Sequence, residues 1–579
     1  MTALVTVLCL AGYALGYFVY ARFLAGRVFV LDPTAPTPAH TMTDGVDYVP
    51  TRRSILFGHH FASITGLAPM LGPAVAVIWG WLPATLWVVL GAIFVGCVHD
   101  FSALVLSMRD RGMSIGKVAE GIIGPRAKML FHLIIFFGIS LAMGVFVFVI
   151  ATLFSLGDNW DPLNPMADPS SFPSTVLPSG VLIVLAVIMG WLLYRRRFPL
   201  APTTAIGFVI VMIAVWIGMK NPLIGVRADA WPAAGGWTLI LLAYAGVASV
   251  LPVWSLLQAR DFLNSLLLYT GLILAYLGIF VWHPDFAAPA WRPDPAGAPS
   301  IFPFVFIIIA CGAASGFHSL VASGTTAKQI NTEGDARFIG YGGMIGESML
   351  GLLAVLACTA GLVGPAATDP TQIWQATYAD WASIGALADK IGAFVTGTAN
   401  FIEALGVGSE PATAFVAVVV VSFALTTLDS ATRLLRFNIS EIGETLHLRI
   451  LRNRYVSSLL AIGAIGFFAL YEIGGNSAGL ALWRLFGTTN QLLAGLALLT
   501  ATLYLKQRRR NPLFTGIPMV FMLASTLTAM VLNLRDFRRD WNDGGAILFV
   551  VGSVLLVLGV WLCVEAVITL ARGTNHPNR

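Results

Sequence analysis

"GHHFASITGLAPMLGPA", residues 58–74, sets two adjacent histidines and two prolines inside an otherwise apolar segment. Proline removes a backbone N–H and glycine weakens a helix, so residues 65–69 (Thr-Gly-Leu-Ala-Pro) predict a break in a helix. Inside a membrane, a broken backbone is tolerated only where protein or a wet cavity satisfies its polar groups. The stretch therefore predicts a membrane helix interrupted at a ligand site. The alternative is a tight packing seam, where glycine is also common.

The composition indicates a membrane protein along the whole chain. Of 579 residues, 57% are hydrophobic and 11% are charged, and the mean hydropathy is +0.81. Apolar segments of roughly 17 to 25 residues, the length of a membrane-spanning helix, recur from end to end. All five cysteines lie inside such segments, so we expect small core residues and no disulfide framework. We therefore predict an all-α polytopic membrane protein.

Fifteen membrane-spanning segments are expected, with starts near residues 2, 56, 84, 129, 178, 203, 238, 263, 301, 341, 411, 455, 477, 514 and 545. With the N-terminus outside, the predicted cytoplasmic segments, Arg260 included, hold 26 of the 34 Lys and Arg residues, and the outer loops hold 7. Cytoplasmic loops are enriched in Lys and Arg. The bias predicts a periplasmic N-terminus and a cytoplasmic C-terminus, and it explains the basic composition without a nucleic-acid partner.

The segments starting near 56 and 301 run in opposite directions and each opens a set of seven helices. The second contains its own break, Cys311-Gly312-Ala313-Ala314-Ser315-Gly316, at a similar depth. Paired broken helices in inverted repeats build the substrate sites of many transporters. The expected division is an extra N-terminal helix at 1–28, a first repeat at 56–283, a second repeat at 301–571 with an external lid helix at 385–409, and a cytoplasmic tail at 572–579.

The substrate is expected at the two breaks and at two amides in the middle of the thirteenth segment. Buried amides need a hydrogen-bond partner, which can be a helix, water or substrate. The predicted substrate-binding residues are Gly66, Ala68, Pro69, Gly72, Gly312, Ser315, Gly316, His318, Asn490 and Gln491.

Ionisable side chains inside a membrane are costly and usually functional. Such residues gather in the predicted cytoplasmic half, and histidine titrates near neutral pH, so the cluster is a candidate proton relay. Its members are His59, His60, His99, Asp100, His318, Glu347 and Asp429. The alternative for each residue alone is a helix-end group that extends to the interface, and this applies most to His59 and Asp429.

A sodium site is the second possibility for the coupling ion. Within "FALTTLDSATR", residues 423–433, the hydroxyls of Thr426, Thr427 and Ser430 accompany Asp429. Hydroxyl, carboxylate and unwound carbonyl oxygens suit Na⁺. The alternative is that these hydroxyls bond back to carbonyls of their own helix.

No metal or other cofactor is expected beyond the coupling cation. Imidazole and carboxylate suit zinc or iron, but adjacent His59 and His60 project about 100° apart on a helix. No His-x-x-x-His or Glu-x-x-His spacing occurs among the candidates, and no Walker A motif occurs to indicate ATP hydrolysis.

Six separate stretches resemble the carbon starvation protein A family of bacterial inner-membrane transporters. They are "DYVPTRRSILFGHHFASITGLAPMLGPAVA", "VHDFSALVLSMRDRGMSIG", "LPVWSLLQARDFLNS", "DARFIGYGGMIGES", "TTLDSATRLLR" and "LFGTTNQLLAGLAL". The resemblance implies a LeuT-like core in which the segments from 56, 301 and 411 are core helices one, six and eight. Gln258-Ala259-Arg260 departs from the family pattern, in which a proline precedes the arginine.

The resemblance also implies uptake of pyruvate or peptides, driven by a cation gradient, when nutrients are scarce. We therefore expect an inner-membrane symporter, surrounded by lipid, that imports a small carboxylate with H⁺ or Na⁺. Pyruvate is the first candidate substrate, and short peptides or amino acids are the second. A nutrient sensor and an intramembrane enzyme with a histidine metal site are the alternatives of other classes.

Overall fold

A computed structural model describes residues 1–571 except 46, 158, 162–167, 169, 197, 252–255, 365–368, 385 and 474–475. The predicted tail at 572–579 lies outside the described residues. The first half of the chain contains α1 (Thr2–Leu15), α2 (Ala21–Phe23), α3 (Pro38–Thr41), α4 (Arg53–Ile64), α5 (Ala68–Ala76), α6 (Trp81–Leu86), α7 (Cys97–Arg109), α8 (Ile115–Ile122), α9 (Pro125–Phe154), α10 (Val176–Gly190), α11 (Leu200–Lys220), α12 (Ala234–Val250) and α13 (Leu257–Trp282).

The second half contains α14 (Ile301–Ile308), α15 (Gly316–Val321), α16 (Ala327–Gln329), α17 (Gly342–Leu356), α18 (Pro370–Thr377), α19 (Leu387–Glu403), α20 (Ser409–Thr445), α21 (Arg454–Ala469), α22 (Gly479–Gln507), α23 (Leu513–Arg539) and α24 (Gly545–Ala571). The strands β1 (Glu472–Ile473) and β2 (Asn476–Ser477) form a short antiparallel pair. Short π-helical turns join several helices end to end, so that 2–28, 81–109 and 333–361 are each one long segment.

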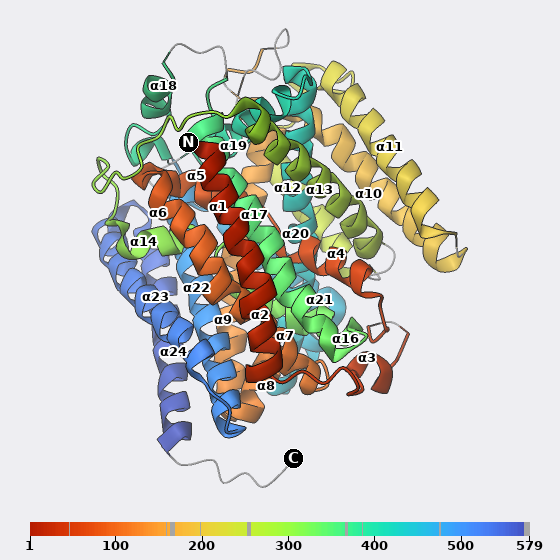
Figure 1. Ribbon diagram of the computed structural model, residues 1–579, viewed down its shortest axis with the longest axis vertical. Coiled ribbons are helices and arrows are strands. Elements are labelled where there is room, and N and C mark those ends of the chain that lie inside the picture. The colour runs from red at the N-terminus through yellow and green to blue at the C-terminus, as the bar shows by residue number, and fades with distance from the viewer. Residues whose placement is uncertain are drawn as a thin grey trace.

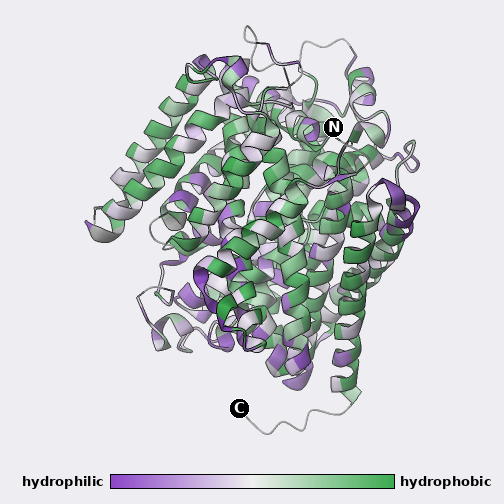
Figure 2. Cartoon of the chain, turned by 180° about the vertical axis from the view of Figure 1, so that it is seen from behind, coloured by the Kyte–Doolittle hydropathy of each residue, from purple (hydrophilic) through white to green (hydrophobic). Residues whose placement is uncertain are grey.

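The helices confirm a multi-pass membrane protein. Ten described helices are long and apolar enough to cross a membrane, and α4 with the helix that follows it passes as one bent pair. The shorter apolar helices α12 and α21, the 29-residue α22 and the broken α14–α15 account for the remaining predicted segments. Hydrophobic residues cover the middle of the molecule and hydrophilic ones its two ends (Figure 2). The predicted all-α class with two broken helices is confirmed.

The first break lies at residues 65–67, between α4 and α5, where the axis bends by 48°. It is shorter than the sequence predicts, because Pro69 stands in the first turn of α5, where its missing N–H costs nothing. Gly66 lies against Thr427, and a Cβ on Gly66 would come within 2.6 Å of the Thr427 hydroxyl. Gly72 is also not part of the unwound segment, since it lies inside α5 against the Ile308 carbonyl.

The second break runs from residue 309 to residue 315, between α14 and α15. Gly312 has a φ of +84°, a left-handed conformation that side chains other than glycine rarely adopt. An added Cβ there would lie 3.4 Å from the Cα of Gly351 on α17, so the unwound chain runs close to that helix. The two breaks, far apart in sequence, lie together because α15 packs on α4 and α14 on α5.

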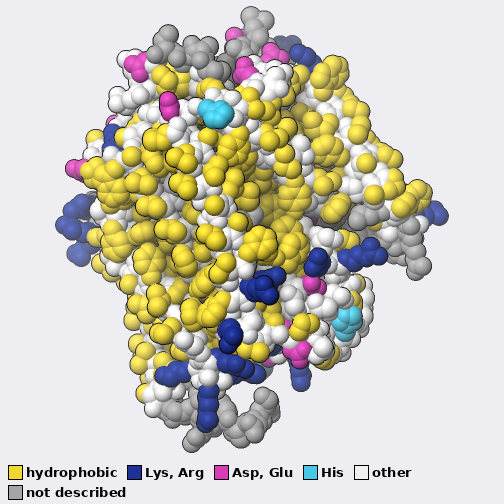
Figure 3. Space-filling view, in the orientation of Figure 1, with side chains coloured by type: hydrophobic (Ala, Val, Ile, Leu, Met, Phe, Trp, Pro, Cys, Tyr) yellow, Lys and Arg dark blue, Asp and Glu magenta, His cyan; other side chains and the backbone are white. Residues whose placement is uncertain are grey.

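Two ends of the molecule differ in charge. Lys and Arg side chains gather over the end that carries α3, α8 and α16, which we call the basic end (Figures 1 and 3). The opposite end carries α18 and α19 (Figure 1). A lid helix is predicted at 385–409, and α19 is the helix found there. It is shorter than predicted and mostly buried against α5, α13 and α20. Lys390, predicted in an outer loop, is buried in α19 and donates a hydrogen bond to the Thr377 carbonyl (2.8 Å).

Candidate functional site

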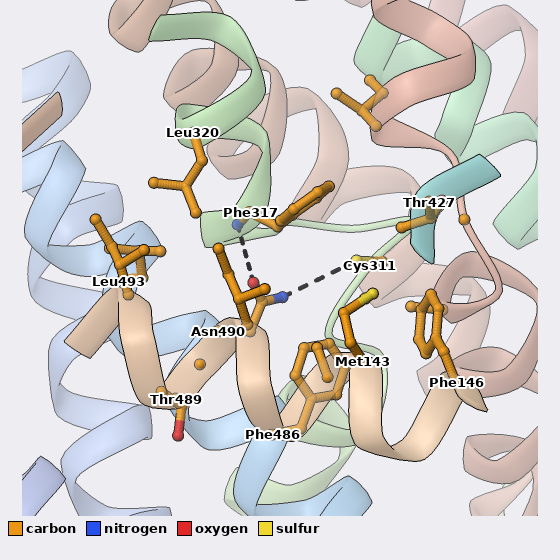
Figure 4. Close-up of a pocket in the computed structure, with 17 residues that line it drawn as sticks. Met143, Phe146, Cys311, Phe317, Leu320, Thr427, Phe486, Thr489, Asn490 and Leu493 are labelled. Carbon is orange, nitrogen blue, oxygen red and sulfur yellow. Dashed lines mark hydrogen bonds between the residues drawn. The ribbon is translucent and has the colours of Figure 1, made fainter. Parts of the chain in front are cut away.

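A small cavity of about 30 Å³ lies where the two breaks meet α9, α20 and α22 (Figure 4). None of the described residues that line it is charged. The lining residues are Ile64, Gly66, Ala68, Ile135, Gly138, Ile139, Ala142, Met143, Phe146, Cys311, Phe317, Leu320, Thr427, Phe486, Thr489, Asn490 and Leu493.

Asn490 on α22 holds the second break open toward this cavity. Its Nδ2 donates to the Ala310 carbonyl at 2.7 Å, and its Oδ1 accepts from the Phe317 N–H at 2.9 Å. Ser315 lies 3.1 Å from the same Nδ2. One amide therefore bonds both ends of the unwound chain, in place of the helix hydrogen bonds that the break removes (Figure 4).

Gln491, the next residue, also hydrogen-bonds to the broken helix but does not line the cavity. Its Nε2 donates to the carbonyls of Phe306 (3.0 Å) and Ile309 (3.4 Å), which are left without helical partners where α14 ends. Both predicted amides thus hydrogen-bond to the backbone at the second break, and only Asn490 of the two also lines the cavity.

The structure brings part of the predicted substrate set to the cavity. Gly66, Ala68 and Asn490 line it, together with Thr427 from the predicted ion site. Other members lie beside the breaks without lining the cavity, namely Pro69, Gly72, Gly312, Ser315, Gly316, His318 and Gln491. Gly316 packs against the Asn490 backbone, so its small size serves helix packing. The aromatic and aliphatic lining from α9 was not predicted, because an apolar helix shows no sign in sequence of which face meets a cavity.

A first buried polar chain surrounds His318 on α15. His318 Nδ1 lies 2.9 Å from Asp100 on α7, and Nε2 lies 3.1 Å from Glu347 on α17. His99 Nδ1 lies 3.0 Å from the other oxygen of Asp100. All four side chains are fully buried. The predicted gathering of His99, Asp100, His318 and Glu347 is therefore present.

His60 stands apart from this chain in its hydrogen bonding. It lies next to His59 in sequence, but its Nδ1 pairs with the Thr326 hydroxyl at 2.8 Å. Adjacent residues point to different sides of a helix, so the two neighbouring histidines serve different partners.

A second buried polar chain joins α4, α13 and α20. His59 Nδ1 lies 2.9 Å from Asp261, and the neighbouring Arg260 forms an ion pair with Asp429. Tyr244 donates to Asp429 (2.6 Å) and accepts from Arg260 (2.6 Å). Arg260, assigned to a cytoplasmic loop from the sequence, is completely buried in α13. A buried guanidinium is costly unless it is paired, which explains its contact with Asp429.

The sequence set did not include Tyr244, Asp261 and Asn264. The sequence shows Arg260-Asp261 as a charged pair at the start of an apolar segment, but the assignment of Arg260 to a cytoplasmic loop kept this pair out of the candidate set. Only the packing of α13 against α4 and α20 shows that each charge meets a partner from a different helix.

The predicted sodium ligands do not converge on one point. Thr426 accepts a hydrogen bond from Asn264, and Asp429 is engaged by Arg260. Ser430 is only partly buried. Thr427 is buried against Gly66, and its hydroxyl has no hydrogen-bond partner in the described part of the chain.

A second, larger cavity of about 530 Å³ opens at the basic end. It shares Ile135, Ile139 and Leu320 with the cavity at the breaks, so only apolar side chains separate the two. Lys117 and Lys328 are among its lining residues.

The comparisons with known proteins agree with these features. A family model described as "Carbon starvation protein CstA" matches residues 1–365 and 365–529. The chain belongs to the CstA family. This CstA-family chain is 34% identical to the "Peptide transporter CstA" of Mycobacterium tuberculosis, over 89% of this chain and 73% of that protein. It is 31% identical to the "Pyruvate/proton symporter BtsT" of Escherichia coli, over 92% of this chain and 81% of that protein.

The crystal structure of MhsT in complex with L-phenylalanine aligns with 90% of this CstA-family chain and 98% of its own, with a TM-score of 0.42 and 11% identity. The curated relatives are named transporters. The predicted family and the predicted class of transporter, not enzyme, are therefore confirmed. The substrate and the coupling ion remain to be assigned.

Proposed function

We propose that this protein imports a small carboxylate nutrient, pyruvate first, across the bacterial inner membrane by symport with protons. The observation that carries the proposal is the cavity shared by both broken helices. The relative named a pyruvate/proton symporter supports this choice, and the relatives named peptide transporters support short peptides as the second candidate. By the positive-inside rule, the basic end faces the cytoplasm, with the N-terminus in the periplasm and the C-terminus in the cytoplasm.

The cavity offers backbone groups for a carboxylate. No Lys or Arg occurs among the described lining residues, but Gly66 and Ala68 stand at the N-terminal end of α5. Pro69 has no N–H, and the N–H groups of Met70 and Leu71 bond to the Leu67 carbonyl, so the backbone N–H groups of residues 66–68 are those left for a ligand. The N-terminal end of a helix carries partial positive charge, which favours an anion. The apolar lining from Met143, Phe146 and Phe486 suits the methyl group of pyruvate. The same lining suits an apolar side chain of a peptide.

The pair His59–Asp261 is the proposed proton carrier. His59 is 10% exposed while Asp261 is fully enclosed, so the histidine connects an internal carboxylate to the outside of the bundle. Ser63, one turn further along α4, also lies 3.4 Å from Asp261. Histidine commonly serves as a proton shuttle in proteins. Asp100 and Glu347 face His318 instead, and we do not assign the coupling proton to them.

The test is uptake of labelled pyruvate into proteoliposomes with an imposed inward proton gradient, with dipeptides as competitors. The proposal requires concentrative uptake driven by the gradient. His59→Gln is expected to abolish the gradient-driven accumulation while leaving pyruvate counterflow intact, because exchange needs no net proton movement. His447→Gln, at an exposed histidine, is the matched control. Counterflow of a dipeptide without any pyruvate uptake would replace the substrate by the second candidate.

Sodium is the second candidate for the coupling ion, because the buried hydroxyls of Thr65 and Thr427 lack hydrogen-bond partners among the described residues. Both lie at the first break, where unwound carbonyls are available. If sodium stimulates uptake, Thr65→Ala combined with Thr427→Ala is expected to remove that stimulation. Unchanged sodium stimulation in this variant would exclude the hydroxyl site.

A further inference from the structure

Three potential metal ligands of different chemistry meet beside the second break. One ligand atom each from Cys311, His318 and Glu347 lie within 4.8 Å of one another, and all three residues are buried. They come from the unwound chain, α15 and α17, so the fold brings them together from three segments. Ligand atoms on one tetrahedral zinc are separated by roughly 3.3 to 3.8 Å, given bonds of about 2.0 to 2.3 Å. A small contraction around an ion is enough to complete the set.

Polar atoms with incomplete hydrogen bonding lie in this cluster. His318 Nε2 stands 3.1 Å from one carboxylate oxygen of Glu347, and the Gly312 backbone N–H also reaches this carboxylate. Neither contact has the geometry of a full hydrogen bond among the described residues. Burying such atoms without full partners is costly. When a neutral His318 donates from Nδ1 to Asp100, its Nε2 is an acceptor facing another acceptor. A cation bound between His318 Nε2 and the Glu347 carboxylate would give these atoms a partner and would remove the repulsion between the two acceptors.

Asp100 supplies the support that metal-binding histidines usually have. Its Oδ2 lies 2.9 Å from His318 Nδ1, and its Oδ1 lies 3.0 Å from His99. A carboxylate on the far nitrogen fixes the tautomer, so that the near nitrogen presents its lone pair to the metal. This arrangement was not readable from the sequence, because the ligands at 311, 318 and 347 follow no metal-binding motif spacing.

We propose that Cys311, His318 and Glu347 bind a transition-metal dication of the zinc or ferrous type, with Asp100 orienting the imidazole. Thiol sulfur and imidazole nitrogen select such ions over Na⁺ or Mg²⁺, which prefer oxygen. Cys311 binds as the thiolate, and its proton passes to solvent as the metal enters. Three protein ligands leave at least one coordination position open. Cys311 also lines the cavity at the breaks, so the site adjoins it.

A shared proton is the competing explanation, and it makes a different demand on the cysteine. A proton between His318 and Glu347 satisfies one oxygen and gives Cys311 no role. In the structure, Cys311 Sγ lies 3.0 Å from the Ser315 hydroxyl and 3.9 Å from the Asn490 amide, and within 4.8 Å of a ligand atom of His318 and of Glu347. The thiol therefore distinguishes the two explanations. The metal site is also independent of the proposed substrate and coupling ion.

The test is titration of the metal-depleted, purified full-length protein with Co²⁺, followed by optical absorption. One Co²⁺ per chain is expected, with d–d bands of a low-coordinate site and a near-ultraviolet band for charge transfer from sulfur. Cys311→Ser should lose the sulfur band, while Cys358→Ser, at another buried cysteine, should keep it. Asp100→Asn should weaken Co²⁺ binding about 10- to 100-fold, as expected for loss of an orienting carboxylate.

Two outcomes would overturn the proposal. One is the absence of stoichiometric Co²⁺ binding to protein that elutes as a single species, and the other is a sulfur band that persists in Cys311→Ser. If Cys311→Ser does not fold, Glu347→Gln replaces it as a nearly isosteric variant. Loss of Co²⁺ affinity is then the expected result, and unchanged affinity refutes the site. Neither readout depends on transport.

Discussion

Gly66→Ala tests whether the contact between the first break and α20 sets the shape of the cavity. The added Cβ would stand 2.6 Å from the Thr427 hydroxyl and 3.1 Å from its Cβ and Cγ2, closer than side-chain carbons tolerate. Overpacking of this kind costs typically about 1 to 3 kcal/mol. Since 1.4 kcal/mol is a factor of ten, that strain corresponds to about a 5- to 150-fold loss if it falls on the substrate-bound state. Gly66→Ala is therefore expected to lower pyruvate uptake within this range.

A compensating substitution makes the reasoning specific. The Thr427 hydroxyl has no hydrogen-bond partner among the described residues, so Thr427→Ala removes the hydroxyl and Cγ2 at little cost and leaves only the Cβ contact at 3.1 Å. Uptake by Gly66→Ala/Thr427→Ala in proteoliposomes should recover most of the loss, relative to Thr427→Ala alone. Gly26→Ala is the control, because no described atom lies within 4 Å of its added Cβ. Wild-type uptake by Gly66→Ala, or a double variant as impaired as the single one, would refute the argument.

Two further substitutions test the buried polar groups. Asp429→Asn leaves Arg260 buried without a counter-ion. The unfolding free energy, measured in mixed detergents, is expected to fall by about 3 to 5 kcal/mol. The double variant Arg260→Gln/Asp429→Asn should recover most of this lost stability. A loss below about 1 kcal/mol would show that the pair is not enclosed as described. Asn490→Leu unpairs a carbonyl and an N–H at the second break, at about 1 to 3 kcal/mol each, and should abolish uptake. Asn533→Leu, at a buried amide away from the cavity, should retain uptake.

The sequence predicts those features that depend on local chemistry. Apolar length predicts each membrane segment, and glycine, joined by proline at the first break, predicts the two breaks, because these effects act within a few residues. Contacts between helices are a different matter. His59 meets Asp261 across 202 positions, and which face of α13 turns toward α4 is decided by packing along the whole helix. Arg260 shows the limit most clearly, since a charge at a segment end is normally a loop residue.

The same limit applies to the interior of the site. Glu347 was predicted as an intramembrane carboxylate from its depth alone, and it is buried as expected. Its proximity to Cys311 and His318 was not predictable, because the unwound chain at Gly312 bends toward α17 with a left-handed residue. Local conformation at one glycine thus brings the thiol into the cluster. The spacing of residues 311, 318 and 347 in the sequence does not indicate this contact.

The adjacent residues Arg260 and Asp261 connect the proposed proton carrier to the cavity. Arg260 of α13 pairs with Asp429 of α20, and Asp261 of α13 pairs with His59 of α4. Both helices also reach the cavity, since Thr427 lies two residues before Asp429 and α4 leads directly into Gly66. A change of protonation at His59–Asp261 alters the attachment of α4 to α13, and substrate at Gly66 alters the contact of α4 with α20. Because such coupling is reciprocal, a bound substrate must shift proton affinity as much as a bound proton shifts substrate affinity.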